Sequence, residues 1–156
     1  MSVVVLDADA VIRHGRTFPE AARRAVNRED TLVLPGAVKR ELVEDVLEGS
    51  PPENHRRSAE RIQILIDAGV LDVRDPDFDR SSAVIDEARR RIANDSLPEH
   101  HVEADQYIPA IVCELAEENR VKLVTGDGKL ANTVQAIAAK QGVAETVSVH
   151  DPLTVL

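Results

Sequence analysis

The stretch that decides the fold is VVVLDADAVI at residues 3–12. It begins with four aliphatic residues, Val3 to Leu6, and Asp7 follows them directly. An uninterrupted aliphatic run is typical of a parallel strand covered on both faces, because a half-exposed strand alternates apolar and polar residues. Ligands bind outside the carboxyl ends of parallel strands. Asp7 is therefore the first candidate site residue, although an aspartate at this position also caps helices.

Four further apolar runs, each bounded by turn residues, predict the other strands. They are Thr31–Leu34, Val70–Val73, Val121–Thr125 and Thr146–Val149. Between these runs, apolar residues recur with the period of about 3.6 residues that marks helices. Alternating strands and helices predict an α/β fold of three layers, in which helices cover both faces of a central, mainly parallel five-stranded sheet.

The length of the chain, 156 residues, predicts one domain, because a domain typically has about 150 residues. No stretch rich in proline and glycine is long enough to join two domains. Three predicted helices, over residues 35–48, 56–68 and 81–93, crowd the middle of the sequence. We therefore expect a single domain over residues 1–156, with a helical subdomain within about 35–95.

The charge balance is strongly acidic, with 19 Lys and Arg against 28 Asp and Glu and a net charge of −9. Only four of the basic residues are lysines. An acidic, lysine-poor composition resembles that of halophilic proteins, which high net charge keeps in solution. In molar salt the Debye length falls to about 3 Å, so this charge does not exclude a nucleic-acid partner.

The composition also bears on localisation. No apolar run approaches the length of about 18 residues that crosses a bilayer, and no basic segment precedes the first apolar stretch. The single cysteine, Cys113, cannot form an internal disulfide or a thiolate cluster for zinc. We expect a cytoplasmic protein without a membrane partner.

Three more carboxylates fall where a site at the sheet edge would use them. Asp127 follows the aliphatic run at residues 121–125, as Asp7 follows the first run. Glu41 lies early in the helix predicted after the second strand, and Asp105 extends the apolar face of a later helix. Each acid taken alone is more simply a turn residue or a solvated helix residue.

Taken together, the four acids predict a metal site. They are expected to converge at one edge of the sheet, where their mutual repulsion is unfavourable without a cation. Oxygen ligands select Mg²⁺ or Mn²⁺, and such an ion can polarise a phosphate oxygen and activate a water. The pattern therefore predicts hydrolysis of phosphodiester bonds by a site built from Asp7, Glu41, Asp105 and Asp127.

The same segments resemble the motifs of PIN-domain ribonucleases, which include the VapC-type toxins of toxin–antitoxin pairs. The strand that ends in Asp7 is similar to the family's opening motif, in which Asn or Ser typically stands where this chain has Asp9. Glu41 matches the family's helix glutamate. Asp105, followed by an aliphatic and a small residue at three and five positions on, resembles the third motif, and the strand ending TGD at residues 125–127 resembles the last.

This resemblance implies that the four acids hold one or two Mg²⁺ or Mn²⁺ ions and that the protein cleaves RNA. Second candidates beside them are Asp9, Glu103 and Thr125, whose hydroxyl is placed to support a ligand. The role implied is that of a toxin or of an RNA-processing nuclease. Besides the RNA substrate, an antitoxin protein and a second copy of the chain are candidate partners.

Two other functions stay open at this point. The stretch at residues 7–9 also resembles the nucleophile and acid of haloacid-dehalogenase-like phosphatases, with Asp7 as the nucleophile. However, Ala and Val at residues 10 and 11 replace the usual Gly-Thr, and Ala131 stands where a second acid is expected. The other alternative is a catalytically silent PIN-like binding module, which would bind no Mn²⁺.

Pro109 tests where the helix after Asp105 begins. If the helix already runs at Val102, Pro109 leaves the carbonyl of Asp105 without its usual partner and bends the helix. If the helix begins near Asp105, the proline falls in the first turn, where it is tolerated.

Overall fold

The structure is a computed structural model that describes residues 2–93 and 104–155. Its centre is a parallel sheet of five strands in the order β3-β2-β1-β4-β5. The strands are β1 (Val3–Leu6), β2 (Thr31–Pro35), β3 (Leu71–Arg74), β4 (Val121–Val124) and β5 (Val147–His150). Each begins and ends within one residue of its predicted range, so the predicted α/β fold class is confirmed.

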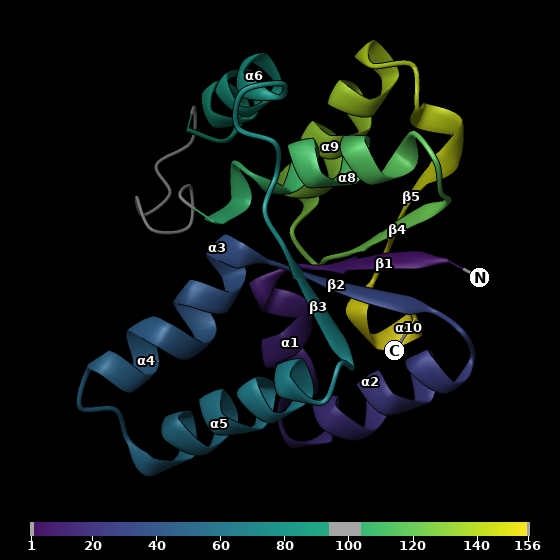
Figure 1. Ribbon diagram of the computed structural model, residues 1–156. Helices are drawn as coiled ribbons and strands as arrows, with labels where there is room; N and C mark the ends of the chain where they lie inside the picture. The colour runs from purple at the N-terminus through teal and green to yellow at the C-terminus, as the bar shows by residue number, and fades with distance from the viewer. Residues whose placement is uncertain (1, 94–103, 156) are drawn as a thin grey trace.

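Helices cover both faces of the sheet (Figure 1). One face carries α1 (Ala8–His14), α2 (Phe18–Asn27), α3 (Gly36–Lys39), α4 (Asp45–Glu48) and α5 (Glu53–Asp67). The other face carries α6 (Ser82–Ala93), α8 (Ile108–Ala116) and α9 (Gly128–Lys140). Short 3₁₀ turns at Gly15–Thr17 and Ala144–Thr146 and a π-helical turn at Arg40–Glu44 complete the connections.

The first strand is covered on both sides, as its sequence predicts. Val4, Val5 and Leu6 are fully buried, because successive side chains of a strand point to opposite faces and both faces carry helices. The main core cluster joins these residues to Val33 and Leu34 of β2 and to apolar side chains of the flanking helices.

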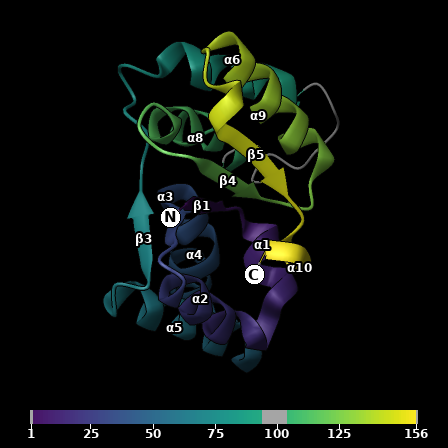
Figure 2. The same ribbon diagram turned by 90° about the vertical axis from the view of Figure 1, so that its right-hand side faces the viewer.

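The helices between residues 35 and 95 are divided between the two faces. α4 and α5 lie with α1 and α2, whereas α6 lies with α8 and α9 (Figure 2). The single domain over residues 1–156 and its helical subdomain stay predictions.

The end of the chain returns to its beginning. The short helix α10 (Pro152–Val155) follows β5 and lies beside α1 (Figure 2). His14 Nε2 lies 2.8 Å from the carbonyl oxygen of Pro152, which joins the two helices. Within residues 2–93 and 104–155, no helix combines the length and the apolar character that a membrane crossing requires.

Pro109 lies in the first turn of α8, which begins at Ile108. A proline here removes no helical hydrogen bond, because the first N–H groups of a helix have no partner within it. Asp105 therefore precedes α8 instead of lying within it, and a turn at residues 106–107 separates the helical backbone at residues 104–105 from α8.

Candidate functional site

The candidate site lies where the direction of the chain's winding reverses. β1 pairs with β4, and Leu6 at the end of β1 is opposite Val124 at the end of β4. From β1 the chain continues into α1 on one face, and from β4 it continues into α9 on the other (Figure 1). Such a switch point leaves a crevice at the carboxyl edge of the sheet, where open α/β proteins bind ligands.

Asp7 caps α1 and is only 3% exposed. Its Oδ1 accepts a hydrogen bond from the backbone N–H of Ala10 at 2.8 Å, and its Oδ2 accepts one from the hydroxyl of Thr125. The pKa of Asp7 is raised to about 6, chiefly by burial and also by the charges of Asp9 and Asp127, although the two hydrogen bonds lower it. Asp7 is thus both a helix cap and a carboxylate held at the sheet edge.

Thr125 connects the two aspartates that follow β1 and β4. Its side chain is buried, and its Oγ1 donates to Asp7 and accepts the backbone N–H of Asp127 at 3.0 Å. Asp127 caps α9, because its Oδ1 accepts the N–H groups of Lys129 at 2.9 Å and of Leu130 at 3.2 Å. Both aspartates therefore start helices from neighbouring strands.

Asp105 lies just before α8 and is partly buried. The pKa of Asp105 is raised to about 7, first by burial and then by the negative charges of Asp7, Asp127, Glu41 and Asp9, in that order. One carboxylate raises the pKa of another only when the two are close, because the repulsion between charges falls with distance. The four predicted ligands and Asp9 therefore lie near one another.

Glu41, whose charge also acts on Asp105, lies in a π-helical turn. α3 follows β2 and continues into the turn at Arg40–Glu44, which contains Glu41 and passes into α4. A π turn inserts one extra residue and rotates the side chains that follow, and such turns are frequent at functional sites. The sequence predicted a regular helix over residues 35–48, so this turn was not foreseen.

Comparison with known proteins identifies the family. A family model described as the halobacterial PIN domain matches residues 1–156. The chain belongs to this PIN-domain family. PIN domains are typically nucleases, so membership places the protein at the coarse level among hydrolases, and the resemblance seen in the sequence motifs is confirmed.

Two solved structures share the fold of this PIN domain at low sequence identity. VapBC-1 from nontypeable Haemophilus influenzae matches with a TM-score of 0.56 and 14% identity, over 97% of this chain and 99% of that chain. VapBC2 from Rickettsia felis, bound to a DNA fragment from their promoter, matches with a TM-score of 0.56 and 12% identity, over 96% and 98% of the two chains. Among the curated proteins compared, none matches this sequence.

In this PIN domain, the carboxylate of Asp9 forms an ion pair with the side chain of Arg13. Asp9 Oδ2 lies 3.0 Å from Arg13 Nε and also accepts the backbone N–H of Gly126 at 3.2 Å. A Cβ on Gly126 would come within 2.6 Å of Asp9 Oδ2 and 2.8 Å of Arg13 Cζ, so glycine is needed for this close approach. Asp9 stands where the family typically has an uncharged Asn or Ser, and Arg13 balances its negative charge. The hydrogen bond from Gly126 to Asp9 also connects α1 to the turn after β4.

The remaining predicted residue, Glu103, lies outside the described residues. A further aspartate that the sequence analysis did not single out, Asp75, follows β3 directly and lies against Gly36 at the start of α3. The signal that marked Asp7 and Asp127, an aspartate at the end of an apolar run, was present at Asp75 as well.

The carboxylates do not form a closed chelate. Within residues 2–93 and 104–155, no three His, Cys, Asp or Glu side chains are grouped closely enough to hold an ion as they stand. The donor set consists of oxygen atoms, which suits Mg²⁺ and Mn²⁺, and the crowded negative charge at Asp105 is what a cation would relieve. The assignment of the metal ligands stays a prediction.

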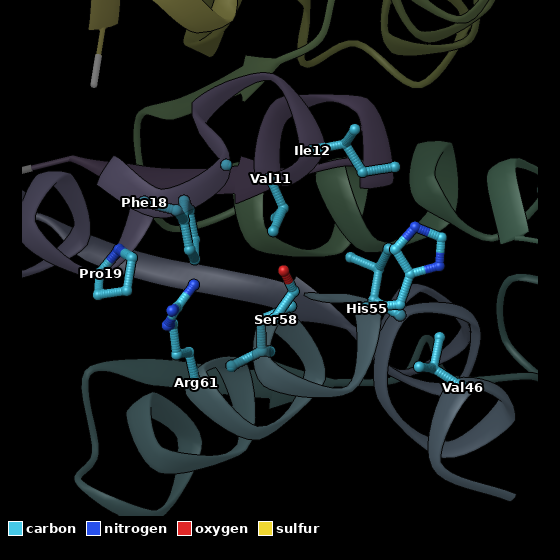
Figure 3. A pocket seen from close by; sticks show the side chains of 11 residues that line it. Val11, Ile12, Phe18, Pro19, Val46, His55, Ser58 and Arg61 are labelled. Carbon is cyan, nitrogen blue, oxygen red and sulfur yellow. The ribbon is translucent and has the colours of Figure 1, made fainter. Parts of the chain in front are cut away.

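A second candidate site is an apolar pocket on the α1 face of the sheet. It has a volume of about 310 Å³ and lies between α1, α2, the π turn with α4, and α5. Figure 3 shows Ser58 and Arg61 of α5 directed toward Val11 and Phe18 on the opposite side. Ile12, which also lines the pocket, is 63% exposed.

Proposed function

We propose that this PIN domain is a ribonuclease that depends on Mg²⁺ or Mn²⁺. The observation that carries the proposal is the contact between the ends of β1 and β4, where Thr125 accepts the N–H of Asp127 and donates to the buried carboxylate of Asp7. Beside them, burial first, and then the negative charges of neighbouring carboxylates, raise the pKa of Asp105. The proposed ligands are Asp7, Glu41, Asp105 and Asp127, with Asp9, Glu103 and Thr125 as supporting candidates. A bound divalent ion would supply polarisation of the phosphate oxygen and a more acidic water.

The chain's own residues position these ligands. Thr125 orients the carboxylate of Asp7, and the N–H groups at the start of α9 orient that of Asp127. Asp9 and Arg13 hold α1 against the turn after β4. The N-terminus of a helix favours negative charge, so the start of α1 opposes the burial and repulsion that raise the pKa of Asp7.

The test is a pair of measurements on the whole protein in molar salt. Calorimetry with Mn²⁺ should show binding to the parent and much weaker binding to Asp105→Asn, and a mixture of RNAs should be cut with Mn²⁺ but not with a chelator. Asp86→Asn, which changes an exposed aspartate on α6, is the matched control and should behave like the parent.

The outcomes separate the alternatives. An absence of both Mn²⁺ binding and RNA cleavage would instead favour a silent binding module. A phosphatase with Asp7 as nucleophile is disfavoured, because Ala10 and Val11 replace the usual Gly-Thr and Ala131 stands where a second acid is expected. The family that matches is also the PIN family and not the haloacid dehalogenases.

We further propose that the apolar pocket takes an antitoxin segment, as in a toxin–antitoxin pair. Its apolar lining and the exposed side chain of Ile12 suit an apolar stripe, and Arg61 and His55 can pair with acidic residues beside that stripe. The test is co-purification with the product of an adjacent small gene. Ile12→Glu should abolish the complex and leave Mn²⁺ binding intact, whereas no partner for the parent would favour an RNA-processing role.

The remaining proposals concern the cellular location, the salt adaptation and the oligomeric state of the protein. A cytoplasmic location is supported by the single cysteine, which suits a reducing compartment. A halophilic adaptation is supported by the acidic composition, with its net charge of −9 and few lysines. A homodimer is a further proposal, which light scattering in molar salt would test.

A further inference from the structure

Two of the chain's three aromatic residues form a pair at the protein surface. The rings of Phe78 and Tyr107 meet edge to face, with centroids 5.7 Å apart and an interplanar angle of 84°. Phe78 is 55% exposed, whereas the third aromatic residue, Phe18, is only 2% exposed and belongs to the core. The chain thus exposes a large aromatic surface although it has very few aromatic residues with which to build a core.

The backbone that carries Tyr107 lies close to that of Asp105. Tyr107 follows Asp105 by two residues, so their Cα atoms are less than about 8 Å apart. Phe78 comes from the loop after β3, which leaves the same carboxyl edge of the sheet from which the segments of the candidate ligands start. The ring contact therefore joins the loop after β3 to the segment that carries Asp105.

The loop that carries Phe78 is held on α8 by one carboxylate. Glu114 accepts the backbone N–H of Asp77 with both oxygens, at 3.1 and 3.0 Å, and the hydroxyl of Ser81 at 2.7 Å. Asp77 in turn accepts the N–H groups of Asp79 and Arg80 through its Oδ1. Phe78 is thus presented on a fixed turn, so a ligand that covers its ring loses little conformational freedom in the protein.

We propose that Phe78 and Tyr107 form a stacking subsite for an unpaired base of the RNA, an inference that rests on the proposed function. Every nucleobase has a flat apolar face, and aromatic side chains bind single strands by stacking on such faces. A base that stacks on Phe78 covers the exposed ring, and the edge-to-face contact with Tyr107 keeps that ring in place.

The charge of the chain favours stacking over phosphate contacts at this subsite. The net charge is −9, and salt weakens contacts between cations and phosphates. Stacking draws on dispersion and apolar burial, which salt does not screen. A single-stranded substrate is therefore recognised here through its bases, whereas a duplex keeps its bases stacked on one another.

The experiment measures binding without cleavage. The probe is a single-stranded RNA of about 12 nucleotides with 2-aminopurine at alternate positions, titrated in EDTA in molar KCl. The parent should quench the fluorescence of the probe. Phe78→Ala and Phe78→Leu should lose the quenching and bind about tenfold more weakly, and Phe78→Trp should restore both.

Ile64→Ala is the matched control, because Ile64 is a similarly exposed apolar residue on α5, across the sheet from α8. It should bind and quench like the parent, and a duplex probe should show no dependence on Phe78. If Phe78→Ala is unfolded by circular dichroism, Phe78→Leu decides. Parent-like quenching and affinity in the folded variant would overturn the subsite.

The assay separates this inference from the proposed function. It uses no metal and no cleavage, so stacking on Phe78 can be measured even if the ligand assignment is wrong. RNA cleavage that needs Mn²⁺, together with unchanged binding by Phe78→Leu, would overturn the subsite alone. A difference between parent and variant that disappears in molar KCl would also overturn it, since that result indicates a contact between charges.

Discussion

The hydroxyl of Thr125 donates a hydrogen bond to Oδ2 of Asp7, across a separation of 118 residues in the sequence. This contact joins the ends of β1 and β4, the two strands between which the winding of the fold reverses. It also favours the ionised form of Asp7, since the hydrogen bond lowers a pKa that burial raises.

Thr125→Val should therefore weaken Mn²⁺ binding near neutral pH. The valine keeps the shape and the strand preference of threonine but leaves Oδ2 of Asp7 without its donor, so the pKa of Asp7 should rise above about 6. We expect a loss of stability of about 1 to 2 kcal/mol. Calorimetry at pH 6 and pH 8 checks the binding, with Thr125→Ser as the control that restores the hydroxyl; equal affinities for parent and valine variant would contradict the role of this bond.

Asp105→Asn should stabilise the metal-free protein at high pH. The pKa of Asp105 is raised from an ordinary value of 3.8 to about 7 in the folded protein, so the folded state holds the proton more tightly than the unfolded state. The stability that this proton contributes is complete below pH 3.8 and is lost as the pH rises through about 7.

In EDTA at pH 8, the asparagine variant should accordingly be more stable than the parent by about 1 to 3 kcal/mol, and the difference should shrink toward pH 4. Urea unfolding at both pH values measures this. Saturating Mn²⁺ should reverse the order at pH 8, because only the parent keeps the carboxylate. A variant less stable than the parent in EDTA at pH 8 would show that the charge of Asp105 is already compensated.

Gly126→Ala should disturb the site and spare the fold. The added Cβ would lie 2.6 Å from Asp9 Oδ2 and 2.8 Å from Arg13 Cζ, so this pair has to move away from the turn after β4. Both contacts are with the ends of side chains that can move, so we expect a stability change below about 1 kcal/mol. RNA cleavage should fall about tenfold, since small displacements of ligands are costly in catalysis.

The matched control is Gly128→Ala, for which an added Cβ meets nothing within 4 Å. It should leave both cleavage and stability near the parent values. Equal rates for the two alanine variants would mean that the pair of Asp9 and Arg13 does not position the site.

Asp127→Asn should separate the capping role of this residue from its proposed role as a ligand. Asparagine keeps an oxygen that can accept from Lys129 and Leu130, so α9 remains capped and the fold is retained. RNA cleavage should fall by about 100-fold or more, because a ligand charge is lost. Asp127→Ala should lose the cap as well, at about 1 kcal/mol of stability measured by urea unfolding. Cleavage by Asp127→Asn at the parent rate would remove Asp127 from the ligand set.

Local sequence was sufficient for the strands and for the placement of Asp7 and Asp127 just after β1 and β4. The aliphatic runs before Asp7 and Asp127 indicate buried parallel strands, and the carboxyl ends of such strands meet at one edge. The π turn at Arg40–Glu44 was not predictable, because a regular helix and a helix with one inserted residue have the same apolar pattern locally. Pro109 left two options for the start of its helix, and in the structure α8 begins at Ile108, which places the proline in the first turn.

The sequence by itself determined that this chain builds a parallel α/β sheet and places acids at its carboxyl edge, since both follow from periodicity and from the order of residues along single segments. The folded molecule was needed to show that Arg13 pairs with Asp9 close to Gly126, and that Phe78 meets Tyr107. These contacts depend on which strands become neighbours and on where each loop crosses a helix. The order of the strands and the paths of the loops depend on how the whole core packs, so no short stretch of residues specifies them.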